Sequence, residues 1–128
     1  MHFHLGQALL WAGRSEQAVA SLSQALRFAP NHPDANYQLA LALADLGRID
    51  EALPCYAKAV RLQPAVDTSP ALHHFLATSY LERRQFRQAL QHEERALQLA
   101  RAQNDPSLTR KIEESLALCQ RLAQTAEP

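Results

Sequence analysis

Apolar residues recur at helical spacing along nearly the whole chain of 128 residues, and no stretch alternates between apolar and polar residues over a strand's length. Gly13 and Gly47 interrupt this pattern at the left-handed position that ends a helix, and prolines mark most other joints. The pattern predicts an all-α chain with helices over about 2–12, 15–28, 33–46, 50–62, 70–83, 86–103 and 106–124.

Two helix starts carry a specific expectation. Asp105 is a good N-cap for the last helix, with Pro106 at the first helical position, where a proline is best tolerated. Pro54 falls inside a helical pattern. If Asp50 caps that helix, Pro54 lies in the first turn, where the lost hydrogen bond costs least.

The chain repeats itself. GRSEQAV at 13–19 and GRIDEAL at 47–53 start 34 residues apart. Further pairs keep this spacing: Ala18 and Ala52, Ala25 and Ala59, and Pro30 and Pro64. A fixed period between 20 and 50 residues is the signature of a repeat array.

These units resemble the tetratricopeptide repeat, a helix–turn–helix unit with the pattern W-x2-L-G-x2-Y, then A-x3-F, then P. In the second unit, the seven pattern positions hold Asn36, Leu39, Ala40, Leu43, Ala52, Tyr56 and Pro64. The first unit has His2, Leu5, Gly6, Leu9, Ala18, Leu22 and Pro30 there. The third unit has His73, Leu76, Ala77, Tyr80, Ala89, Glu93 and Arg101.

The resemblance implies an all-α, right-handed α-solenoid of three TPR-like units plus a C-terminal capping helix. It implies a single domain over 1–128, with repeat 1 at 1–32, repeat 2 at 33–66, repeat 3 at 70–103 and the capping helix at 106–124. The small pattern residues are expected to allow close helix contact, with the leucines filling the space around them. His2 and His73 are interpreted as packing residues with a polar edge at the surface, and Glu93–Glu94 as a solvated face.

The third unit departs from the pattern in three ways. Its spacing from the second is 37 rather than 34 residues, which places an insertion in AVDTSP at 65–70. Arg84 stands where the other units have glycine, and a non-glycine residue in the left-handed conformation costs about 1–2 kcal/mol, so we expect a different turn there. Arg101 replaces the proline, so the helix is expected to continue to about Gln103.

Arrays of this kind hold a partner's peptide or helix on a concave surface lined by the first helices of successive units. Helical spacing within each unit then gives a predicted partner-binding groove made of Phe3, Gln7, Leu10, Trp11, Tyr37, Gln38, Leu41, His74, Thr78 and Leu81. The aromatic and leucine residues would bury area, and the amides and Thr78 would bind a partner's backbone. The alternative is that several of these residues pack against a neighbouring unit.

The residue types exclude one specialised role. Family members that clamp acidic chaperone tails use Lys, Arg and Asn in the groove to bind a carboxylate. The corresponding positions here hold only apolar groups and amides: Phe3, Gln7, Gln38, Ala71 and Phe75. Without a cation to pair the carboxylate, we predict that the chain is not such a clamp.

Composition narrows the partner class further. Thirteen Lys and Arg balance thirteen Asp and Glu, with no block of like charge, which argues against nucleic acid or an anionic membrane as partner. No apolar stretch is long enough to span a membrane, and the N-terminus is a poor signal peptide. Cys55 and Cys119 lie far apart and are expected to be buried thiols. A cytoplasmic protein is the default prediction.

No catalytic or metal motif is present. The sequence lacks H-E-x-x-H, a phosphate loop and a nucleophile elbow, and adjacent residues such as His73 and His74 point about 100° apart on a helix, so they cannot easily share one ion. We therefore predict a non-catalytic protein–protein interaction module with no cofactor and no metal. Two alternatives stay open: a self-assembly element that forms a homo-oligomer through its uncapped N-terminal face, or the C-terminal fragment of a longer array.

Overall fold

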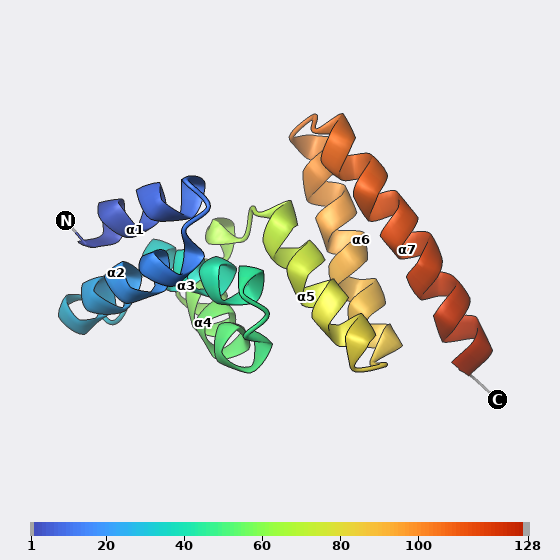
Figure 1. Cartoon of the computed structure of the whole chain (residues 1–128), viewed down its shortest axis with the longest axis horizontal. Coiled ribbons are helices and arrows are strands. Elements are labelled where there is room, and N and C mark those ends of the chain that lie inside the picture. Colours follow the sequence, from blue (N-terminus) through green and yellow to red (C-terminus); the bar gives the residue numbers. More distant parts are fainter. Residues whose placement is uncertain (1, 127–128) are drawn as a thin grey trace. The chain divides into compact units, whose positions relative to one another are not determined.

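The computed structural model describes residues 2–126, with the side chains of residues 3–125, and that part of the chain is helical apart from short connections (Figure 1). The α-helices are α1 (His2–Trp11), α2 (Ser15–Phe28), α3 (Pro33–Asp45), α4 (Ile49–Leu62), α5 (Pro70–Glu82), α6 (Phe86–Ala102) and α7 (Pro106–Ala126). A 3-10 turn, η1 (Pro64–Val66), follows α4. The all-α prediction is confirmed, and each predicted helix is present with ends within two residues of the expected ones.

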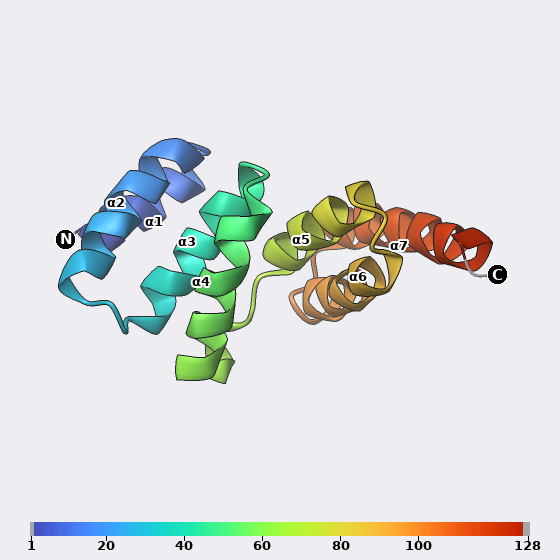
Figure 2. The same ribbon diagram turned by 90° about the horizontal axis from the view of Figure 1, so that it is seen from below.

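The helices form two compact units. The first ends at Thr68 and contains α1 to α4 and η1, and the second starts at Ser69 and contains α5 to α7. In the first unit, α1 pairs with α2 and α3 with α4, and α2 also packs on α3 (Figures 1 and 2). In the second unit, α6 lies between α5 and α7 and contacts both. Each unit is thus a stack of antiparallel helices in chain order.

Small residues let paired helices approach closely, as the pattern predicts. A Cβ at Gly6 would lie 2.6 Å from Cγ of Leu22, so only glycine fits α1 against α2 at that point. The equivalent residues of the other repeats, Ala40 and Ala77, have no exposed surface. The alanines on the second helix of each pair are equally buried, at positions Ala18, Ala52 and Ala89. The two helices of each pair can therefore pack closely because the residues at their contact are glycine or alanine.

The same type of left-handed turn follows four of the described helices. Its central residue is Gly13 at φ 77°, Gly47 at φ 75°, Arg84 at φ 61° and Asn104 at φ 54°. In the third repeat, Arg84 N–H donates to the carbonyl of Leu81 at 3.0 Å and Gln85 N–H to that of Tyr80 at 2.9 Å. The other three turns have the same pair of bonds, the Schellman pattern. The prediction of a different turn at Arg84 is therefore wrong, because these bonds hold the arginine in the glycine conformation.

Helix starts give one confirmed and one wrong prediction. Asp105 caps α7, since its Oδ1 accepts from the N–H of Leu108 at 3.1 Å. Asp50 does not cap α4. The helix starts at Ile49, the N-cap position belongs to Arg48, and Arg48 makes no side-chain capping bond. Pro54 consequently lies in the second turn of α4 rather than the first.

The leucines of the repeat pattern are not equally buried. Leu39 is 8% exposed and Leu76 is fully buried, as predicted, but Leu5 is 52% exposed, so the prediction of packing is wrong for Leu5. In the first unit, α1 packs mainly on α2, whereas α3 contacts both α2 and α4. The Leu5 position of α1 is therefore open, whereas the equivalent position of α3, Leu39, is covered.

No helix within the described part of the chain is both long enough and apolar enough to cross a membrane.

Candidate partner-binding surface

The predicted contact residues of α1 line one helix and are mostly half-buried. Phe3, Gln7 and Leu10 are partly covered, and Trp11 at the end of the helix is 77% exposed. The ring of Phe3 packs against the ring of His32, with centroids 4.7 Å apart. Helix α1 therefore combines apolar and amide groups that keep part of their surface in solvent. His2, predicted to be a packing residue, has a side chain outside the described ones.

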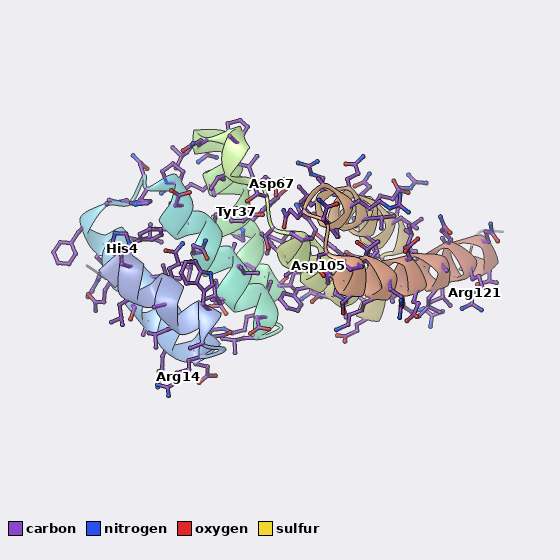
Figure 3. All side chains as sticks on the ribbon, turned by 90° about the horizontal axis from the view of Figure 1, so that it is seen from above. His4, Arg14, Tyr37, Asp67, Asp105 and Arg121 are labelled. Atoms are coloured by element: carbon purple, nitrogen blue, oxygen red, sulfur yellow. The ribbon has the colours of Figure 1, made fainter. Side chains whose placement is uncertain are left out.

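Tyr37, on α3, is placed differently from its neighbours. Its side chain is only 3% exposed, and its hydroxyl donates to Oδ1 of Asp67 at 3.0 Å. Tyr56 of α4 donates to the other oxygen of the same carboxylate at 2.9 Å. Figure 3 shows Tyr37 and Asp67 pointing toward one another. The inserted segment after η1 thus supplies an acceptor for two tyrosines, and Tyr37 supports this contact instead of presenting an open face.

Gln38 and Leu41, also on α3, are half-buried. Among the described residues, Oε1 of Gln38 is a buried side-chain oxygen without a hydrogen-bond partner. A buried acceptor with no donor costs about 1–3 kcal/mol. Such a group is a candidate for completion by a ligand.

The three predicted contact residues of the second unit lie along α5. His74 has a 16% exposed side chain, and its Nδ1 lies 2.7 Å from Oε1 of Glu93. Thr78 is exposed and its hydroxyl donates to the carbonyl of His74 at 2.9 Å, while Leu81 is half-buried. The imidazole of His74 is therefore engaged inside the unit, and Thr78 and Leu81 are the more accessible members.

Glu93 corrects the interpretation of Glu93–Glu94 as a solvated face. Glu93 has no exposed surface, whereas Glu94 is exposed. The second carboxylate oxygen of Glu93 accepts from Oγ of Ser115 on α7 at 2.6 Å. One buried side chain of α6 is thus bonded to both α5 and α7. Its place in the repeat pattern, equivalent to Leu22 and Tyr56, was a usable signal for burial.

The interpretation of His73 also needs correction. His73 is 2% exposed rather than edged by solvent, and its Nδ1 lies 3.0 Å from Nδ1 of His92. His92 also stacks on Tyr80, with centroids 5.6 Å apart. Because one imidazole nitrogen must donate and the other accept, this contact fixes complementary tautomers. The pair holds α5 against α6.

The described residues contain no metal-binding cluster, and the clear pKa shifts among them are few. No group of three or more His, Cys, Asp or Glu side chains within them is placed to hold a metal ion. Hydrogen bonding to Arg48 lowers the pKa of the exposed Glu51, which is a local surface pair. Burial raises the pKa of the Cys55 and Cys119 thiols, so both are poor nucleophiles.

The fold defines an all-helical repeat protein built from helix–turn–helix units, and comparison with known proteins identifies the family. A tetratricopeptide repeat model matches residues 3–67, just over half of the chain, and a second tetratricopeptide repeat model matches residues 71–107. The chain belongs to the tetratricopeptide repeat family.

Two known proteins illustrate the similarity. Protein KINESIN LIGHT CHAIN-RELATED 1 of Arabidopsis thaliana is 29% identical in a match that covers 74% of this chain and 18% of that protein. The chain therefore spans less than a fifth of the length of this curated relative. The solved structure of MamA MSR-1 C2 superposes with a TM-score of 0.58 at 17% identity, over 98% of this chain and 77% of that chain. This second likeness concerns the fold.

Proposed function

We propose that the chain binds an extended segment or an amphipathic helix of a partner protein on the outward faces of its first helices. Membership in the tetratricopeptide repeat family makes it a protein–protein interaction or assembly module. The proposed contacts within the first unit come from α1 and α3, namely Phe3, Gln7, Leu10, Trp11, Gln38 and Leu41. Helix α5 of the second unit offers a separate set, His74, Thr78 and Leu81. Tyr37 positions the face of α3 through Asp67.

The unpartnered carbonyl oxygen of Gln38 carries this proposal. Folding has placed an acceptor where the described residues offer no donor. Because this oxygen is itself buried, a partner's backbone N–H would reach it once the half-buried Gln38 side chain turned outward on binding. The new hydrogen bond would then remove a cost of about 1–3 kcal/mol. Half-buried Leu41, one turn further along α3, would add apolar contact, which favours a partner with apolar side chains.

Separating binding from folding tests the proposal. Peptides would be selected from a displayed random library on the full chain, and the affinity of the best binder measured by fluorescence anisotropy. Gln38→Met removes the amide at similar volume, so it should leave stability unchanged or higher while weakening binding about tenfold. Leu41→Glu should weaken binding through an unpaired charge. Ala57→Glu, at an exposed position of α4, is the control and should bind normally.

The proposal fails if Gln38→Met and Leu41→Glu retain wild-type affinity for every selected peptide while remaining folded by circular dichroism. Equal weakening by Ala57→Glu would show that the effect is general charge repulsion and would also count against it.

Assembly through the N-terminal face is a second candidate, favoured by the exposure of Leu5. Leu39, the counterpart of Leu5 in the second repeat, is covered. Trp11, which lies on α1 with Leu5, is even more exposed than Leu5. A second copy packed on α1 would bury both. Sedimentation of wild type should then show mass increasing with concentration, with the Leu5→Gln/Trp11→Gln variant monomeric and Leu118→Gln, a control on α7, still associating. A wild type that is monomeric at high concentration removes this candidate.

A further inference from the structure

The turn between α5 and α6 borders a pocket of about 330 Å³ within the second unit. Its walls come from the turn, the start of α6 and one residue of α7. Arg84 and Arg87 supply positive charge, and Phe86, Leu90 and Ala123 supply apolar surface, with two glutamines between them. None of the partner-binding residues of α5 described above lines this pocket.

At one position of this turn the charge has the opposite sign from that in the other repeats. Arg87 occupies the repeat position that holds Glu16 in the first repeat and Asp50 in the second. The first turn of α6 contains no acidic residue, whereas α2 and α4 have acidic first turns. Acidic residues are the favourable choice at a helix start. The arginine therefore occupies a position where helix stability favours the opposite charge.

Arg84 is also retained against a conformational cost. It adopts φ 61° where the first two repeats have glycine, and a non-glycine residue there costs about 1–2 kcal/mol. Its guanidinium carbon lies 5.9 Å from the centre of the Phe86 ring, a cation–π distance that holds the charge at the pocket wall. Strained residues of this kind concentrate at functional sites.

The positive charges of Arg84 and Arg87 are available to a ligand because few carboxylates lie near them in the sequence. Residues 82–87 contain three arginines and one glutamate, Glu82. Arg83 is engaged in an interaction of its own, so the charge of the pocket rests on Arg84 and Arg87. Among the described residues, no ion pair joins either of these two arginines to a carboxylate. At the corresponding turn of the second repeat, by contrast, Glu51 neutralises Arg48 with bonds that include one of 2.9 Å.

We propose that this pocket binds an acidic segment of a partner protein. A glutamate or aspartate of the segment meets the guanidinium groups of Arg84 and Arg87, which suit a planar carboxylate. An adjacent apolar side chain of the segment lies against Phe86, Leu90 and Ala123. The proposal concerns a surface other than the first-helix faces, so either one can fail without the other.

The chain offers variants that separate binding from stability. Arg84→Gly restores the glycine of the other repeats, and Arg87→Glu restores the acidic residue found at the equivalent position of the first repeat. Both changes favour the fold, so lost binding cannot be attributed to unfolding. Arg110→Gln removes one exposed charge elsewhere on α7 and is the matched control.

The probe is a short fluorescent peptide in which glutamates alternate with leucines, compared by anisotropy with the same peptide carrying glutamines. We expect the full chain to bind the glutamate peptide, more weakly as salt is raised, and to ignore the glutamine peptide. Each of Arg84→Gly and Arg87→Glu should weaken binding roughly tenfold or more. Arg110→Gln should leave binding within about twofold of wild type, as expected for one exposed charge outside the pocket.

Several outcomes would overturn the proposal. These are equal binding of the glutamine peptide, wild-type affinity in Arg84→Gly and Arg87→Glu, or a comparable loss in Arg110→Gln, which would indicate unspecific attraction. Tighter binding of a serine-phosphorylated peptide or an oligonucleotide would also overturn it, since the ligand would then be a phosphate rather than a carboxylate.

Discussion

At the scale of single residues, the left-handed turn that follows four of the described helices accepts three different residue types. Glycine adopts this conformation without penalty, asparagine with little, and arginine at a cost. All three occur here with the same two backbone hydrogen bonds. The turn is therefore determined by the bonds that close it, and the residue at its centre affects stability rather than geometry.

Arg84→Gly is accordingly expected to stabilise the protein. Relief of the left-handed strain, reduced by the greater freedom of glycine in the unfolded chain, should raise the free energy of unfolding by about 0.5–1 kcal/mol. Urea denaturation measures this change. Asn104→Gly is the control, and it should gain less because asparagine tolerates the same conformation. Destabilisation by Arg84→Gly would mean that the arginine side chain contributes more to the fold than its strain costs.

Because the Cys119 thiol is buried, we expect the free energy of unfolding to fall at alkaline pH. Cys119 has no exposed surface, and burial, followed by the charge of Glu93, raises the pKa of its thiol. A raised pKa means that the stabilising contribution is complete below the unfolded-state value, ordinarily about 8.5, and is lost as pH rises through the folded-state value.

The free energy of unfolding of wild type should thus fall more steeply than that of Cys119→Ala as pH rises from neutral to about 10, the range in which a thiol titrates. Parallel slopes for the two proteins would contradict this expectation.

At the scale of helices, one buried carboxylate connects the three elements of the second unit. Glu93 of α6 is bonded to His74 of α5 and Ser115 of α7, next to the alanine and isoleucine contacts between α6 and α7. A buried network of this kind stabilises only while all its members are present, because each lost partner leaves a polar group unsatisfied.

Removing that carboxylate should therefore be costly. Glu93→Ala is expected to lower the free energy of unfolding by about 3 kcal/mol, and Glu93→Gln by less because an amide still offers hydrogen bonds. Glu94→Ala, one residue along on the exposed side, should change it by no more than about 0.5 kcal/mol. Thermal denaturation followed by circular dichroism distinguishes these values, and similar effects from both alanine variants would exclude a special role for Glu93.

For the whole molecule, contacts concentrate within the two units. In repeat proteins stability is close to a sum of local and neighbour terms, so damage to one unit need not spread. Glu93→Ala should thus reduce hydrogen-exchange protection across residues 70–126 much more than across α1 to α4. Equal loss of protection in both units would show that the chain unfolds as one cooperative domain.

Local signals along the chain were sufficient to place the helices. The positions of all seven α-helices, the cap at Asp105 and the small residues at helix contacts follow from periodicity and residue type, because each depends on neighbours a few positions away. The wrong cap at Asp50 shows the limit of this approach, since several polar residues near a helix start can compete for that role.

Tertiary structure alone decided which of these residues are accessible. The amphipathic pattern places Tyr37, Glu93 and Leu5 on helix faces, but it does not say what lies opposite them. Asp67 of the inserted segment bonds to buried Tyr37, and Ser115 of α7 bonds to buried Glu93. Leu5, by contrast, is exposed. The sequence by itself thus determined the helices and their period through local hydrogen bonding and apolar spacing. The surface was decided by contacts between residues distant in the chain, because burial depends on which side chain meets each face.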